Sequence, residues 1–160
     1  MKRAFHAALA ACILAPSAQA ESVAPGDVSY DEAGAVAASL TGQPGNAEEG
    51  AKVFSTKSVG NCVSCHEVTA LADVPFQGNV GPSLDGVADR WTEHEIRGIV
   101  ADAKKTYDGT VMPSFYKVSG FIRPGKAYTG KAIPAEEITP LLSAQQIEDV
   151  VAFLVTLKDE

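Results

Sequence analysis

The stretch Cys62-Val63-Ser64-Cys65-His66 is the strongest signal in the sequence. It places two thiols three residues apart and an imidazole directly after the second thiol. On a turn that runs into a helix, both thiols can reach the two vinyl groups on one edge of a porphyrin, and the histidine is carried beneath the ring. The motif is typical of covalent attachment of a c-type haem. It predicts Cys62 and Cys65 as the attachment residues and His66 as an axial ligand of the iron.

The first twenty residues have the pattern of a secretory signal. Lys2 and Arg3 precede a short apolar run, residues 4–15, and Ala18-Gln19-Ala20 follows as an A-x-A cleavage site. The run is too short to span a bilayer, which takes about 20 apolar residues. We expect cleavage after Ala20 and a periplasmic location. The alternative is that Cys12 belongs to a lipidation site, which would attach the chain to a membrane.

The composition argues for one globular domain and against nucleic acid or an anionic membrane surface as a partner. The chain has 160 residues, of which 46% are apolar, and its formal net charge is −7. Loss of Lys2 and Arg3 with the signal would take the charge from −7 to −9. Phosphate groups need a basic footprint, which this balance does not provide. A freely diffusing partner is expected to present a basic face, with an encounter that slows as salt is added.

The cysteine pair has three other interpretations: a thioredoxin-like redox site, a structural disulfide and half of a zinc site. A redox site of that kind belongs near a βαβ pattern, which the sequence lacks. A zinc site with four protein ligands needs two more cysteines or histidines, and only His94 remains outside the motif and the signal. Haem attachment is the best interpretation because the motif and the predicted export agree.

Met112 is the candidate for the second axial ligand. It is the single methionine after the predicted signal and lies 46 residues beyond His66, in Thr110-Val111-Met112-Pro113. A thioether is a soft ligand that raises the haem potential and suits electron transfer. His94 is the alternative ligand, although its place between two glutamates on a predicted helix favours exposure to solvent. An open iron position would instead indicate a haem enzyme such as a peroxidase, or a ligand sensor.

Capping residues and apolar periodicity predict three helices. Asn46 precedes a predicted helix over residues 47–56. Thr92-Glu93-His94-Glu95 has the pattern of a capping box that opens a helix to about Lys105. Ser143 caps a C-terminal helix. The apolar residues of that helix recur at helical spacing and are Ile147, Val150, Val151, Leu154 and Leu157.

The other segments are predicted to be loops, with one exception. Residues 67–90 and 106–140 are punctuated by glycine and proline and contain no good alternating strand pattern. The alanine-rich stretch from Tyr30 to Leu40 is expected to form a short helix, within an extension over residues 21–46 that lies across the domain surface. We expect an all-α fold in which three to four helices and long loops surround a large apolar group.

Three pieces of the sequence resemble class I cytochromes c, over nearly all of residues 47–157. Gly50 and Phe54 match the G-x-x-x-aromatic pair of that family's N-terminal helix, and Val150-Val151-Ala152-Phe153-Leu154 matches the C-terminal helix that crosses it. Gly81-Pro82-Ser83-Leu84-Asp85-Gly86-Val87 resembles the family's G-P-x-L-x-G loop. The resemblance implies the class I cytochrome c fold around one covalently bound haem c.

The same resemblance implies roles for residues around the haem. The carbonyl of Pro82 would accept the Nδ1 proton of His66 and so fix its tautomer. Leu84 would pack on the ring. Arg90 and Trp91 resemble residues that neutralise or hydrogen-bond a haem propionate, although Arg90 is equally explained as a surface charge.

Further features resemble the SoxX family, the small monohaem subunits of periplasmic SoxAX complexes. They are Ser39-Leu40-Thr41-Gly42-Gln43-Pro44-Gly45, Asn61, residues 81–91, Arg97-Gly98-Ile99-Val100 and the long stretch between Met112 and Leu141. The resemblance implies a heterodimer with SoxA, in which a modified cysteine-ligated haem of SoxA carries the L-cysteine S-thiosulfotransferase chemistry. This chain would have no catalytic residue. It would accept the electrons released when thiosulfate is coupled to a cysteine of the carrier SoxYZ, and pass them to a downstream cytochrome.

The expected organisation is a signal at 1–20, an N-terminal extension at 21–46 and a cytochrome c domain at 47–160. Within the domain, the loop 114–140 is expected to face the partner, because loops of that length are uncommon unless they are functional or disordered. The alternative is a free-standing soluble periplasmic electron carrier. That alternative explains the haem and the acidic charge, but it gives no reason for the two extra segments.

Overall fold

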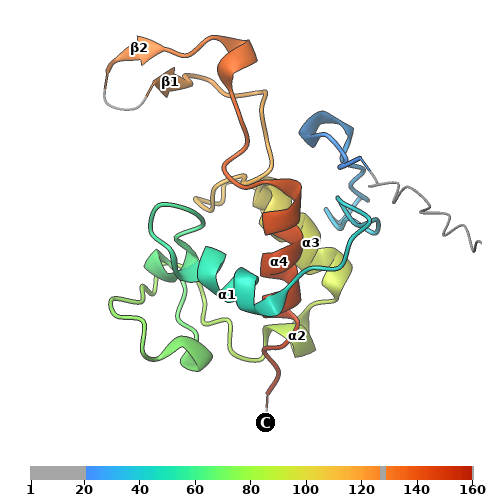
Figure 1. Cartoon of the computed structure of the whole chain (residues 1–160), viewed down its shortest axis with the longest axis vertical. Helices are drawn as coiled ribbons and strands as arrows, with labels where there is room; N and C mark the ends of the chain where they lie inside the picture. The colour runs from blue at the N-terminus through green and yellow to red at the C-terminus, as the bar shows by residue number, and fades with distance from the viewer. Residues whose placement is uncertain (1–20, 127–128, 160) are drawn as a thin grey trace, which may run out of the picture.

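The structure is a computed structural model that describes residues 21–126 and 129–159. Within these residues the α-helices are α1 (Ala47–Ser55), α2 (Val87–Arg90), α3 (Glu93–Asp102) and α4 (Ala144–Leu154) (Figure 1). Two strands of two residues each, β1 (Gly125–Lys126) and β2 (Lys131–Ala132), pair antiparallel. The prediction of an all-α fold with three to four helices and long loops is confirmed. The predicted signal and Cys12 lie outside the described residues, and no helix in the described part is long and apolar enough to cross a membrane.

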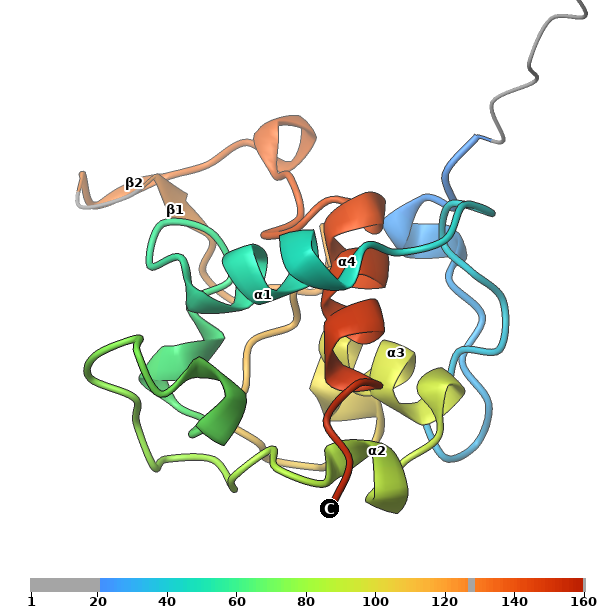
Figure 2. The same ribbon diagram turned by 60° about the horizontal axis from the view of Figure 1, so that its bottom comes forward.

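The core forms where α1 crosses α4 (Figure 2). Gly50 lies so close to α4 that a Cβ atom at this position would overlap the backbone carbonyl oxygen of Asp149. Beside this contact the rings of Phe54 and Phe153 meet edge to face, with their centroids 5.6 Å apart. The crossing of the N-terminal and C-terminal helices that the resemblance implies is therefore present.

Side-chain caps fix where three of the helices begin, as the sequence predicts. The side chain of Asn46 accepts hydrogen bonds from two backbone N–H groups in the first turn of α1, at 2.9 and 3.1 Å. Thr92 and Ser143 each form a capping box with the residue three positions further on. α3 is shorter than predicted, because it ends at Asp102 and the chain continues to Lys105 as a 3₁₀ turn.

The alanine-rich stretch from Tyr30 to Leu40 forms no helix, so that prediction is wrong. The Asp31 carboxylate accepts hydrogen bonds from the backbone N–H groups of Ala33 (2.9 Å) and Ala35 (2.8 Å). Such local bonds offer the backbone an alternative to helical hydrogen bonds. Gly34 then takes a φ of +89°, which lies outside the right-handed helical region.

Two elements lie in segments that the sequence predicts to be loops. α2 begins directly after Gly86, whose φ of +65° turns the chain into the helix. β1 and β2 lie in the segment that runs from Lys117 to Leu141, whose described residues we call the arm. Figures 1 and 2 both show the arm extending away from the helices.

A buried ion pair connects residues 21–46 to α3 and α4. Arg97 on α3 is 3% exposed and Glu148 on α4 is 4% exposed. The Nε of Arg97 lies 3.0 and 3.2 Å from the two carboxylate oxygens of Glu148. Glu148 also accepts a hydrogen bond from the backbone N–H of Leu40 (2.7 Å), and Arg97 donates one to the carbonyl of Val36 (3.1 Å). One ion pair therefore connects three separate parts of the chain.

Candidate functional site

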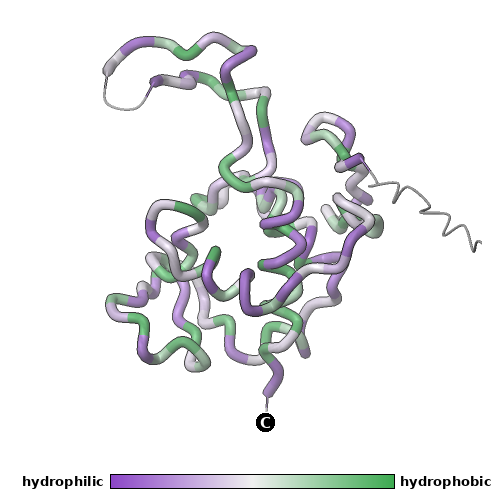
Figure 3. Tube along the Cα trace, in the orientation of Figure 1, coloured by the Kyte–Doolittle hydropathy of each residue, from purple (hydrophilic) through white to green (hydrophobic). Residues whose placement is uncertain are grey.

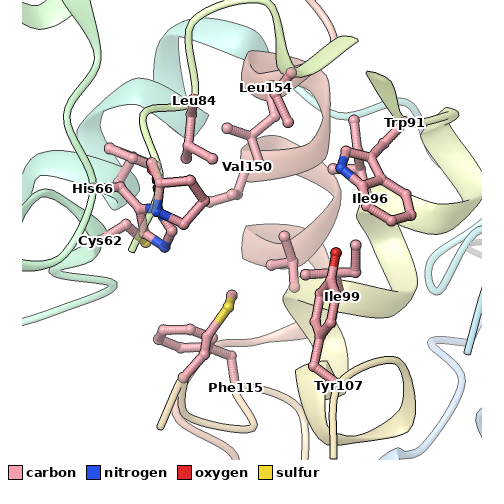
Figure 4. A pocket seen from close by; sticks show the side chains of 15 residues that line it. Cys62, His66, Leu84, Trp91, Ile96, Ile99, Tyr107, Phe115, Val150 and Leu154 are labelled. Atoms are coloured by element: carbon pink, nitrogen blue, oxygen red, sulfur yellow. Dashed lines mark hydrogen bonds between the residues drawn. The ribbon is translucent and has the colours of Figure 1, made fainter. Parts of the chain in front are cut away.

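An apolar cavity lies between α1, α3, α4 and the loops around them (Figure 4). Its empty volume is about 660 Å³, including the part that is open to solvent. The residues on its wall that were predicted as site residues are Cys62, His66, Pro82, Leu84, Trp91 and Met112. The rest of the wall comes mainly from apolar side chains of the helices, such as Phe54, Ile96, Val150 and Leu154. The fold thus gathers residues that are far apart in the sequence around one cavity.

A tight turn presents the cysteine motif to this cavity. Cys62–Ser64 form a 3₁₀ turn, and the backbone N–H groups of Cys65 and His66 each donate to the carbonyl of Cys62 at 3.0 Å. Asn61 enters the turn at a φ of +53°, a left-handed conformation that asparagine visits more readily than most residues. Both thiols are free; Cys62 lines the cavity and Cys65 does not. Burial raises the pKa of the Cys62 thiol to about 12.

His66 is held by the loop that passes its ring. Its Nδ1 lies 2.8 Å from the backbone carbonyl oxygen of Pro82. A carbonyl can only accept, so Nδ1 donates and the lone pair on Nε2 stays free to bind a metal. Gly81 allows the contact, because a Cβ atom there would overlap the imidazole. The hydrogen bond between His66 and Pro82 that the resemblance implies is therefore present.

Met112 reaches the cavity from a loop that polar contacts hold in place. Its carbonyl accepts a hydrogen bond from Nζ of Lys104 (2.6 Å), and its backbone N–H donates to the hydroxyl of Thr110 (3.2 Å). Two residues later, the hydroxyl of Ser114 donates to the buried carboxylate of Asp102 at 2.6 Å. These contacts hold the loop that carries Met112 against the end of α3.

The remaining predicted residues divide into two groups. Leu84 and Trp91 line the cavity, as a role beside a bound ring requires. Arg90 is exposed and lies outside the cavity wall. Its guanidinium donates to the backbone carbonyls of Asp85 (2.7 Å) and Ser83 (3.1 Å). Arg90 therefore stabilises the loop that carries Pro82, whose carbonyl accepts the hydrogen bond from His66.

Sequence reasoning missed two aromatic residues of the wall, Tyr107 and Phe115. The ring of Tyr107 packs edge to face on Trp91, with centroids 6.1 Å apart, and Phe115 is buried. Their closeness to Met112 in the sequence is the signal that could have found them. His94, the alternative ligand, is exposed and is absent from the residues that line the cavity.

The residues present fit a c-type haem. The cavity wall is almost wholly apolar, as a flat macrocycle needs, yet it carries an imidazole with a free Nε2, a thioether and a thiol. These are the groups that hold such a haem covalently and ligate its iron. The second thiol, Cys65, directly precedes His66 on the same turn.

Comparison with known proteins agrees with this geometry. Residues 47–158 match the family described as Cytochrome c, and the chain belongs to that family, whose members transfer electrons through covalently bound haem c. Among solved structures, a chain in the crystal structure of SoxXA from P. pantotrophus is 60% identical to this one. The match covers 86% of this chain and 99% of that chain, with a TM-score of 0.82. The resemblance to SoxX is thereby confirmed, while no curated protein matches the chain.

Proposed function

We propose that this chain is the haem-carrying electron-transfer subunit of a periplasmic complex of the SoxAX type. The observation that carries the proposal is the 60% identity to a chain of the SoxXA structure, over 99% of that chain. The proposed partner is a SoxA subunit, and the proposed carrier of the substrate is SoxYZ. The periplasmic location rests on the signal pattern before Glu21.

Four residues would hold the haem. The thiols of Cys62 and Cys65 would form its thioether bonds, and Nε2 of His66 and Sδ of Met112 would be the axial ligands. Haem c held in this way takes up and releases one electron at a time. The carbonyl of Pro82 would keep the imidazole in one tautomer and orientation, and the apolar wall would keep water from the iron.

The electrons would come from the oxidation of thiosulfate in the partner. Joining thiosulfate to a cysteine thiol of SoxYZ forms one sulfur–sulfur bond and releases two electrons and one proton. We assign that bond formation to SoxA, so this chain contributes no catalytic residue. The chain would pass the two electrons, one after the other, to a downstream cytochrome.

Purification from the native host tests this function. We expect gel filtration of the periplasmic fraction to show the chain together with SoxA, and mass spectrometry to show covalent haem on it. A Cys62→Ala/Cys65→Ala variant should carry no covalent haem. A Met112→Ala variant should lose the absorption band near the red edge that sulfur-ligated ferric haem shows. A haem-loaded chain that elutes alone would instead identify a free-standing electron carrier, and a chain without haem would refute both functions.

A further inference from the structure

The arm gains little stability from the rest of the fold. β1 and β2 have two residues each, and a lone hairpin is marginally stable in water. Figure 1 shows the arm standing away from α3 and α4. A segment of this kind gains stability when a partner covers it.

The arm has a formal net charge of +2, from four basic residues and the carboxylates of Glu136 and Glu137, on a chain that is acidic as a whole. Between Asp108 and Glu136 the sequence has no acidic residue. Its basic residues in this interval are Lys117, Arg123, Lys126 and Lys131. Nζ of Lys126 lies 3.5 Å from Glu137, whereas the other three form no salt bridge with any residue that the structure describes. Because the formal net charge of the chain is −7, this positive charge is a local property of the arm.

Apolar side chains are exposed among these charges. Ile122 is 97% exposed and Leu141 is 61% exposed. Both line a groove between the arm and the body of the protein, and Pro113 and Glu137 line it as well. Figure 3 shows hydrophobic and hydrophilic segments in succession along the arm. Since Pro113 directly follows Met112, the groove lies beside the loop of the candidate iron ligand.

We propose that the arm and its groove dock an acidic protein surface that inserts an apolar side chain into the groove. The proposal rests on the proposed function, because the partner that would carry this surface is the SoxA subunit. An apolar patch with a charged rim is typical of a protein interface. Carboxylates on the partner steer it to the arm and disfavour basic proteins there, while the apolar contact supplies affinity. Docking at this place brings the partner next to the loop of Met112, the candidate iron ligand.

Binding kinetics between the haem-loaded chain and purified SoxA test the docking surface. We expect association to slow as NaCl is raised, because salt screens the attraction between the basic arm and an acidic partner surface. Charge reversal in Arg123→Glu/Lys131→Glu should slow association by about tenfold and flatten its salt dependence. The matched control, Lys57→Glu/Lys158→Glu, changes the net charge equally on exposed residues outside the arm and should have an effect below about twofold.

A second pair of variants tests the apolar contact. Ile122→Ser should speed dissociation by about tenfold, whereas Phe76→Ser, at a residue that is 85% exposed elsewhere, should leave it unchanged. Because Ile122 is almost fully exposed, its replacement should leave the fold intact. An unchanged haem spectrum of the variant checks this. Failure of the unaltered chain to bind SoxA would refute the proposed function. Tight binding that neither arm variant changes, or association that speeds up with salt, would refute the docking surface and leave the function standing.

Discussion

Replacement of Glu148 by glutamine isolates the charge of the buried pair with Arg97. The variant keeps the size of the side chain and one oxygen that can accept from the backbone N–H of Leu40. It removes the negative charge that balances a guanidinium with only 3% of its surface exposed. Arg97 would keep its contacts with the carbonyl of Val36 and with Glu93, a residue whose side chain is 57% exposed.

The size of the expected stability loss follows from the burial of Arg97. Removing one partner of a buried ion pair leaves an uncompensated charge and costs about 3–5 kcal/mol. The carboxylate of Glu93 still balances part of the positive charge of Arg97. We therefore expect a loss at the lower end of this range, about 3 kcal/mol in the free energy of unfolding. For a domain of this size that corresponds to a fall in Tm of about 10 °C. The N-terminal segment should loosen at the same time, since Leu40 donates to the replaced group.

The assay is guanidinium and thermal unfolding of the haem-loaded protein, followed by circular dichroism. Hydrogen exchange at the amide of Leu40 should become faster in Glu148→Gln. The control is Glu49→Gln, which breaks a pair with Lys52 on the surface of α1 (2.6 Å) and should leave stability unchanged. A loss below about 1 kcal/mol in Glu148→Gln would show that Arg97 is hydrated or balanced in another way, and the reasoning would fail.

Three further substitutions have outcomes that the structure specifies. Ser114→Ala removes the hydroxyl that donates to Asp102, so the loop of Met112 should loosen and added imidazole should displace the thioether about tenfold more readily in a spectroscopic titration. Gly50→Ala pushes a methyl group into the backbone of α4 and should cost about 1–3 kcal/mol in denaturant unfolding. Burial, and then the charge of Asp102, raise the pKa of Tyr30 from 10.0 to about 12, so the ionised phenolate is disfavoured in the folded state. The stability of the natural chain relative to Tyr30→Phe should therefore be constant below pH 10 and fall between pH 10 and 12, as unfolding at each pH measures.

The helices that are predictable from the sequence are those with local start signals. Asn46, Thr92 and Ser143 each satisfy orphan N–H groups within the next three residues, so their effect does not depend on the rest of the fold. Asp31 shows the opposite case, because the same kind of side chain closes a turn in an alanine-rich stretch and excludes the helix there. Local propensity alone does not distinguish these two uses of a short polar side chain.

The site shows the same division between local and distant causes. Cys62, Cys65 and His66 are predictable because their spacing on one turn is itself the chemical requirement. Outside the site, the pairing of Arg97 with Glu148 joins residues 51 positions apart and has no local signal. Tyr107 lies close to Met112 in the sequence, but its place on the cavity wall depends on how the end of α3 meets the loop beyond it.

The cavity explains why a chain with such short helices adopts one fold. α1, α3 and α4 contribute apolar side chains to the wall of one cavity of about 660 Å³, part of which is open to solvent. Apolar side chains on such a wall gain dispersion contacts when a flat apolar group packs against them. A covalently held apolar ring would pack against this wall, and its two predicted attachment residues, Cys62 and Cys65, lie at the next 3₁₀ turn along the chain after α1. A group held at the cysteine motif would therefore contribute to the stability of the fold as well as to its chemistry.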